Sequence, residues 1–275
     1  MPSSTLVTFA AGALEGSGSV LHVVPGDGAS VIVVDATPFH PVDHTWPDHV
    51  EITEAVMAAI SDEGEFSVGA DIPVKRGAEG WTWLVGHRLA GDAPEWLAPG
   101  LSVGLSVGAA RRAALSRGHT ACHLASLALD LALADLWRKD PGVDALGNPD
   151  FEGRANQTSR IHEDGSVDEY RLGKSLRRAG FDTETFAATL SEREASVNAQ
   201  LAVWVASGAI SSIVTDGPTI VDRRTWVCEL PDGKAEILCG GTHVSSLTEF
   251  ASISIMLDLS DPQLLVMTTT AVPAA

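Results

Sequence analysis

Two short histidine motifs, far apart in the sequence, constrain the fold of this chain more than any other feature. The first is His119-Thr-Ala-Cys-His123 and the second is Cys239-Gly-Gly-Thr-His243. If the first segment is helical, its two histidines lie on one face, four residues apart. Three imidazoles and one thiolate form a ligand set that suits a tetrahedral zinc ion. The sequence therefore predicts that these two segments meet at a zinc site.

Simpler explanations exist for each motif taken alone. Two histidines spaced by four arise by chance on amphipathic helices, and a Gly-Gly turn can connect the strands of a hairpin. The short supply of ligands favours the metal site over coincidence. The chain has only 3 Cys and 9 His, yet these two segments contain Cys122, Cys239 and three of the histidines.

Length and composition indicate a soluble globular protein. The 275 residues are enough for one large domain or two smaller ones, and 45% hydrophobic with 20% charged residues is ordinary. Three cysteines give no disulfide framework, and the residues after Met1 do not resemble a signal peptide. The cysteine usage leads us to expect a protein of the reducing cytoplasm, and no apolar run reaches membrane-spanning length.

The charge balance is strongly acidic, with 18 Lys+Arg against 36 Asp+Glu and a net charge of −18. Proteins that hold nucleic acid usually present a basic face, because phosphate neutralisation supplies much of the affinity. Two local basic groups are either phosphate contacts or solvated helix faces. They are Arg111, Arg112 and Arg117, and Arg171, Lys174, Arg177 and Arg178.

Residues 1–107 are predicted to form a β-rich domain. Valine-rich runs and Gly-containing turns predict strands at Val20–Val24, Ser30–Val34 and Trp81–Val85. A helix is expected from about Ile52 to Ile60. The Gly- and Pro-rich stretch Gly91–Gly108 is expected to be a linker.

Residues 108–275 are predicted to form an α+β domain with helices packed on an antiparallel sheet. Apolar positions recur near a period of 3.6 from about Ala109 to Trp137, so a long helix carries the first motif. Gly118 costs helix propensity and is expected to allow close approach of another backbone. A second helix is expected over Glu184–Ser207, capped by Asp182 or Thr183 and followed by Gly208.

The rest of this domain is expected to consist of a loop-rich section and several strands. The loops are expected from Gly142 to Gly165. The strands are expected at Ile210–Val214, Thr219–Leu230, Ala235–Leu238 and Ile253–Leu257.

The two motifs together resemble the editing domain of alanyl-tRNA synthetases and its free-standing, AlaX-type relatives. The basic run Arg112-Ala-Ala-Leu-Ser-Arg-Gly-His119 and the order Asp222-Arg-Arg-Thr-Trp-Val, turn, Cys-Gly-Gly-Thr-His are similar to the family's pattern. Upstream, Asp35-Ala-Thr-Pro-Phe39 resembles the start of the small β-barrel that precedes the editing core. The resemblance covers most of residues 30–257 and implies a barrel-like N-terminal domain followed by a zinc-binding hydrolase domain.

The resemblance implies a zinc-dependent hydrolase that cleaves the ester of mischarged tRNA(Ala) carrying serine or glycine. Its zinc ligands would be His119, His123, Cys239 and His243. Thr242 and Cys122, next to two of these ligands, would line the catalytic pocket, with Gly240 and Gly241 keeping the loop free of bulk. Gln157 and Ser159 match substrate-contacting positions loosely, and loop hydrogen bonding is their alternative role.

Two departures from the family bear on substrate binding. A glycine-rich loop of the family is replaced by Pro38-Phe-His-Pro41 and a segment that contains His44 and His49. We expect His44 to face the metal pocket; a polar loop with incidental histidines is the alternative. The second departure is the net charge of −18.

Competing functions remain open at this point. A zinc hydrolase of the same fold could act on a small ester or amide, and a closed four-ligand zinc site could be purely structural. Gly100-x-Ser102-x-Gly104 and Gly104-x-Ser106-x-Gly108 fit the nucleophile elbow of serine hydrolases. However, Pro94 and Pro99 stand where that elbow needs a core strand, so we expect the serines to belong to a linker.

Overall fold

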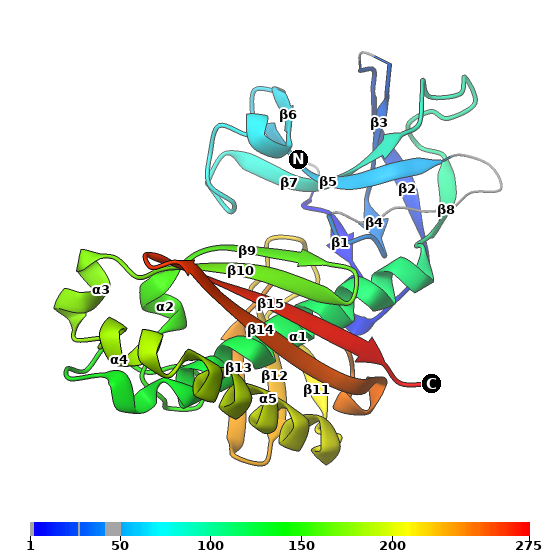
Figure 1. The fold of residues 1–275 in the computed structure, drawn as a ribbon. Helices are drawn as coiled ribbons and strands as arrows, with labels where there is room; N and C mark the ends of the chain where they lie inside the picture. Colours follow the sequence, from blue (N-terminus) through cyan, green and yellow to red (C-terminus); the bar gives the residue numbers. More distant parts are fainter. Residues whose placement is uncertain (1–2, 27, 42–50) are drawn as a thin grey trace. The chain divides into compact units, whose positions relative to one another are not determined.

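The computed structural model describes residues 3–26, 28–41 and 51–275. The chain divides into two compact units, each described here by itself (Figure 1). The first unit contains the chain up to Arg112 together with Thr215–Arg224 and Gly240–Thr242. The second contains Ala113–Val214, Thr225–Cys239 and His243–Ala275. Both units are therefore assembled from segments that are far apart in the sequence.

The first unit is built on a six-stranded antiparallel sheet. Its strand order is β6-β5-β7-β3-β2-β8. The bounds are β2 Glu15–Val24, β3 Val31–Val34, β5 Ile52–Ser61, β6 Phe66–Val68, β7 Trp81–Leu89 and β8 Ser102–Ser106. A short parallel pair, β1 (Leu6–Val7) with β4 (Ala36–Thr37), and two short 3-10 helices, Phe9–Ala11 and Gly69–Asp71, complete it. The β-rich prediction is confirmed, but no sheet among the described residues closes into a barrel.

The helix predicted at Ile52–Ile60 is wrong, because this segment is strand β5. Its Ala, Met and Glu residues have good helix propensity, which the sheet overrides. β5 pairs with β7 along almost its whole length and with β6 on its other side. Ile52, Ala55 and Ala59 are buried in the core of the first unit. Tertiary pairing of this kind commonly outweighs local propensity.

The linker predicted at Gly91–Gly108 is wrong in part, because it contains strand β8. β8 pairs with β2 at the edge of the sheet, with Ser106 opposite Glu15. Ser102 and Ser106 are both exposed on this strand. Its glycines and serines are typical of a linker. They are compatible with a strand here because β8 is at the edge of the sheet and buries little apolar surface.

The second unit surrounds one buried helix, α1 (Ala109–Ala132), which carries the first motif. Leu124, Ala125, Ala128 and Leu129 are each fully buried, so successive faces of α1 contact protein. On one side the Cys122 thiol donates to Asp168 of β10, and on another the His123 ring packs on Trp226 of β12. A helix that is buried all round belongs to the core of its domain.

Two antiparallel sheets and several helices complete the second unit, and the predicted α+β class is confirmed. One sheet has the order β14-β15-β10-β9 and the other β11-β12-β13. Helix α5 (Leu190–Ser207) runs along β14, where Asn198 donates to the Ile255 carbonyl and accepts from its amide (Figure 1). The strands are β9 Asn156–His162, β10 Gly165–Arg171, β11 Ser211–Thr215, β12 Arg224–Leu230, β13 Gly233–Leu238, β14 Phe250–Asp261 and β15 Leu264–Pro273.

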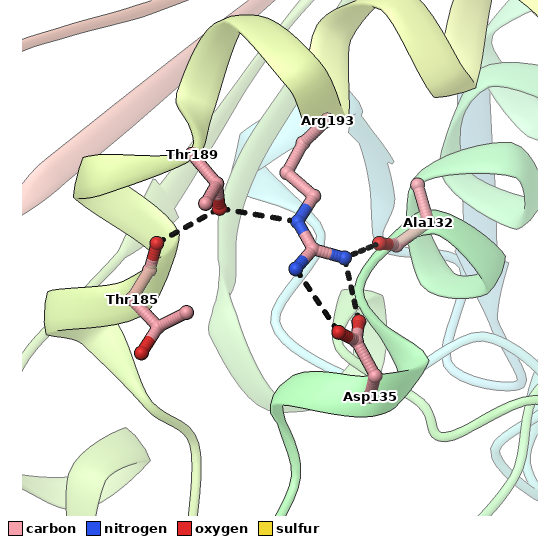
Figure 2. A network of polar contacts seen from close by, with 5 residues as sticks. All are labelled: Ala132, Asp135, Thr185, Thr189 and Arg193. Carbon is pink, nitrogen blue, oxygen red and sulfur yellow. Dashed lines mark hydrogen bonds and ion pairs between the residues drawn. The ribbon is translucent and has the colours of Figure 1, made fainter.

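The second predicted helix is divided in two, α4 (Thr183–Ala188) and α5. The cap predictions are confirmed: the Asp182 side chain accepts from the Thr185 amide, and Gly208 has a left-handed φ of 63°. At the break, the Thr189 hydroxyl donates to the Thr185 carbonyl and accepts from Arg193. Arg193 also donates to the Ala132 carbonyl at the end of α1 and to both carboxylate oxygens of Asp135 (Figure 2).

Several elements had no counterpart in the sequence-based prediction. The prediction of loops from Gly142 to Gly165 is wrong in part, because helix α2 (Glu152–Ala155) and the whole of strand β9 lie in this section. β10, β15, a 3-10 helix at Ala134–Leu136, another at Leu247–Glu249, and α3 (Lys174–Ala179) were not predicted. In the described part of the chain, no helix has the length and apolar character needed to cross a membrane.

Candidate metal centre

The two motifs meet within the second unit. His119 and His123 lie one turn apart on α1, with ring centroids 4.8 Å from each other. Cys239 directly follows β13, and His243 comes four residues later. One ligand atom from each residue lies within 4.8 Å of the ligand atoms of the other three. These four half-buried side chains could hold one metal ion.

The spacing inside the cluster suits tetrahedral coordination. The Cys239 Sγ atom is 3.3 Å from His119 Nε2 and 3.3 Å from His243 Nε2. Zinc bonds of about 2.0–2.1 Å to nitrogen and about 2.3 Å to sulfur place tetrahedral N and S ligands roughly 3.5 Å apart. The spacing of Cys239 to His119 and to His243 therefore fits zinc, and the atoms of all four ligands lie within 4.8 Å of one another.

His243 is held in one orientation by Thr120, the residue that follows His119. The Thr120 hydroxyl lies 3.1 Å from His243 Nδ1 and accepts from the Val244 amide at 3.2 Å. Since Nε2 of His243 faces the Cys239 sulfur, Nδ1 is the nitrogen left to carry the proton and donate to Thr120. Such outer hydrogen bonds fix the tautomer of a metal-binding histidine.

His123 is the most enclosed ligand of the four. Burial, and then the neighbouring His119, lowers the pKa of His123 to about 3, which keeps its ring neutral and able to bind a metal. Its Nε2 atom is buried and has no hydrogen-bond partner. The ring packs against Trp226, whose indole N–H donates to Ser211 at 2.7 Å. A bound metal ion would satisfy the orphaned nitrogen, which is a second sign that the residues fit zinc.

The other residues predicted to line the pocket differ in their burial and in what they contact. Cys122 is buried and its thiol points to Asp168, 3.5 Å away. Thr242 is half-buried and directly precedes His243. Gly240 has room for a side chain, since the nearest atom to an added Cβ is Arg76 Nη1 at 3.8 Å, and Gly241 is buried.

Gln157 and Ser159 lie on edge strand β9 rather than in a loop. The Gln157 side chain donates to the Asn156 carbonyl, and the Asn156 side chain donates to the Ser159 hydroxyl. Both residues are exposed, and these two hydrogen bonds stay within β9. His44 and His49 lie outside the described residues.

The two basic groups differ in how far the fold uses them. Arg112 is buried and donates to the carbonyls of Ala13 and Pro38, and Arg117 forms an ion pair with Asp164. Arg171, Lys174, Arg177 and Arg178 are all exposed, and Arg177 also donates to the Leu172 carbonyl. The second group therefore has the exposure of a solvated helix face.

A metal centre is supported by the residues and geometry of this chain alone. No family model matches this chain, and a search of curated proteins gave no significant match.

Sequence reasoning missed the roles of Thr120 and Trp226, which contact the ligands, and the buried polar side chains of β10. Thr120 lies inside the first motif, but its role depends on His243, which is distant in the sequence. Asp168 and Tyr170 are on the unpredicted strand β10, and Trp226 was noted only as part of a resemblance. The alternation of side chains along Gly165–Arg171 was the one available signal for the buried face of that strand.

Proposed function

We propose that this chain is a zinc-dependent hydrolase whose metal is held by His119, His123, Cys239 and His243. The observation that carries the proposal is the convergence of four ligand atoms within 4.8 Å of one another. The chemistry that zinc supplies when bound is Lewis-acid polarisation of a carbonyl and activation of water at neutral pH.

The chain's own residues would prepare that chemistry. Thr120 orients the His243 ring, and Trp226 together with the surrounding core shields His123 from solvent. The thiolate of Cys239 would contribute negative charge to the centre and hold the ion against the three neutral imidazoles. All four ligands are only half-buried, which leaves the centre within reach of a bound substrate.

As substrate we propose the ester of a mischarged aminoacyl-tRNA, of which seryl- and glycyl-tRNA(Ala) are the candidates. This part of the proposal is supported by the motif pattern around both ligand pairs. The ester of an aminoacyl-tRNA is an activated carbonyl, so modest catalysis would suffice. Thr242 and Cys122 are proposed to line the pocket because each adjoins a ligand.

A small ester or amide is the second candidate substrate, favoured by the charge of the protein. The net charge of −18 opposes the approach of a polyanion, and Arg112 and Arg117, which could have bound phosphate, are occupied within the fold. A small neutral or cationic substrate carries no such penalty.

Hydrolysis assays on a defined panel test the proposal. Purified protein is incubated with seryl-tRNA(Ala), glycyl-tRNA(Ala) and small aminoacyl esters, with and without a chelator. We expect chelation and Cys239→Ala to remove turnover, because both remove the metal. Ser106→Ala, on exposed edge strand β8, should leave turnover unchanged.

Other results in these assays would indicate a different mechanism or role. Turnover that survives chelation and Cys239→Ala but disappears in Ser106→Ala would establish a serine hydrolase. Metal binding without turnover on any member of the panel would establish a structural zinc module.

A further inference from the structure

A second polar cluster lies in the core of the second unit and includes Cys122, the residue before the ligand His123. It occupies the face of β10 that packs toward α1. Along β10, side chains two residues apart point to the same face, and Ser166, Asp168 and Tyr170 are all at most 1% exposed. Thr269, on β15, is opposite Ser166 in the strand register and is also fully buried. The full cluster is Cys122, Glu152, Ser166, Asp168, Tyr170 and Thr269.

The carboxylate of Asp168 is at the centre of this cluster. One oxygen accepts from the Ser166 hydroxyl at 2.7 Å and the other accepts from the Cys122 thiol at 3.5 Å. Glu152, at the start of α2, lies close enough to interact electrostatically with Asp168 and with Tyr170. Within residues 3–26, 28–41 and 51–275, no Lys or Arg forms an ion pair with either carboxylate.

Three buried polar atoms of the cluster have no hydrogen-bond partner. They are Glu152 Oε2, the Tyr170 hydroxyl and Thr269 Oγ1. Tyr170 is fully buried, and although its hydroxyl faces the Glu152 carboxyl, no hydrogen bond of normal geometry joins them. Burying two carboxyls, one of them with an unpaired oxygen, and two unpaired hydroxyls is costly unless a donor with positive charge completes the cluster.

We propose that this cluster binds a primary ammonium group, supplied by the amine of the substrate. An ammonium group has three N–H donors and one positive charge, and every unpaired atom of the cluster can accept a hydrogen bond. Cys122 lies between the ligands His119 and His123 on α1, so the helix that carries two of the metal ligands also contributes a side chain to this cluster. The inference rests on the proposed function and narrows its substrate to esters or amides that carry a free amino group.

Binding of small probes to the full chain tests the inference without any hydrolysis. The probes are 2-aminoethanol and ethylene glycol, which differ in the ammonium group, together with ammonium chloride and potassium chloride at matched ionic strength. Thermal-shift titration, with and without a chelator, measures each affinity. We expect 2-aminoethanol to bind at least about tenfold more tightly than ethylene glycol, as charge-assisted hydrogen bonds allow. Equal affinities would overturn the inference.

Substitutions on the two faces of β10 test whether 2-aminoethanol binds at this cluster. Asp168→Asn should weaken 2-aminoethanol binding by about tenfold or more, whereas Glu169→Gln should leave it unchanged, because Glu169 is on the opposite face of β10 and pairs with Arg160. If Asp168→Asn fails to fold, Tyr170→Phe decides, since it removes only an unpaired hydroxyl. Unchanged binding in Tyr170→Phe would then overturn the inference.

The remaining outcomes distinguish a free cation from a substrate amine. They also distinguish failure of the ammonium site from failure of the proposed function. Tighter binding of ammonium or potassium ions than of 2-aminoethanol would assign the cluster to a free ion and overturn the substrate amine. Hydrolysis of aminoacyl esters without selective 2-aminoethanol binding would overturn this inference alone. Selective binding without any hydrolysis would support the ammonium site and count against the proposed function.

Discussion

The hydroxyl of Thr120 and the Nδ1 atom of His243 lie 3.1 Å apart, although 123 residues separate them in the sequence. Thr120 follows one candidate ligand on α1, and His243 is another, so this contact joins the two halves of the metal centre. The Val244 amide donates to the same hydroxyl. Thr120 therefore positions His243 without itself being a ligand.

Removing this hydroxyl should weaken metal binding. We expect Thr120→Val to lower zinc affinity by about 10- to 100-fold, because His243 loses the partner that fixes its orientation. Thr120→Ser keeps the hydroxyl and should bind zinc like the wild type. Competition with a chromogenic chelator measures both. Equal affinities for the valine and serine variants would show that the contact does not position the ligand.

Gly118 should resist substitution for a steric reason. A Cβ at this position would come within 2.3 Å of the His162 carbonyl oxygen and 2.7 Å of that of Gly165, so α1 packs directly on the β9–β10 turn. Alanine would gain up to about 1 kcal/mol of helix propensity, yet we expect Gly118→Ala to lower the free energy of unfolding by about 1–3 kcal/mol. Urea unfolding measures the change. Gly104→Ala, with no atom near the added Cβ, is the control and should be close to neutral.

His87 should make the stability of the first unit sensitive to acid. Its Nδ1 atom donates to the Ile32 carbonyl at 3.3 Å, so Nε2 must accept from the Thr37 hydroxyl at 2.9 Å, and the ring is neutral. Burial lowers its pKa from 6.5 to about 4. Between these two pH values the unfolded chain binds a proton that the folded chain does not, so stability falls as the pH drops through this window.

The size of this effect can be measured by comparison with a variant that does not titrate. We expect His87 to account for roughly 2 kcal/mol of lost stability between pH 7 and pH 5. Urea unfolding of the wild type and of His87→Gln at several pH values separates this contribution from those of the other histidines. An identical pH dependence in the two proteins would show that His87 is already charged in the fold.

Arg193 should stabilise the junction of α4, α5 and the end of α1. Its guanidinium joins Thr189, the Ala132 carbonyl and Asp135 (Figure 2). Arg193→Lys keeps the charge but loses the planar fork, so we expect a loss of about 1–2 kcal/mol in the free energy of unfolding. Asp135→Asn should cost less than about 1 kcal/mol, because the Asp135 side chain is 68% exposed. A larger loss in Asp135→Asn than in Arg193→Lys would contradict this ranking.

The metal cluster could be predicted from the sequence because its signals are local. Histidines at 119 and 123 share a face of any helix, and Cys239 and His243 are four residues apart, so only the meeting of the two pairs required the fold. Gly118 was predicted to allow close backbone approach, and the atoms within 3 Å of its added Cβ confirm this. The caps at Asp182 and Gly208 were predictable for the same reason.

The missed elements depend on partners that the local sequence does not reveal. Ile52–Ser61 has helix-favouring composition, yet strands on both of its sides hold it in the sheet. The buried residues Ser166, Asp168 and Tyr170 of β10 alternate with the half-buried Val167 and Glu169, so the strand lacks the apolar alternation that is typical of a strand. The ammonium-binding cluster was invisible for that reason, because its acidic and hydroxyl residues look like surface residues until α1 covers them.

Metal content measured on the purified chain tests the central claim most directly. Protein purified without chelator is analysed by elemental mass spectrometry, before and after incubation with zinc and removal of the excess. We predict about one zinc ion per chain for the wild type and a strong loss in both Cys239→Ala and His123→Ala, with Cys228→Ala, a buried cysteine outside the cluster, retaining full content. A wild type that contains no transition metal and takes up none, or one whose zinc survives both ligand substitutions, would contradict the account.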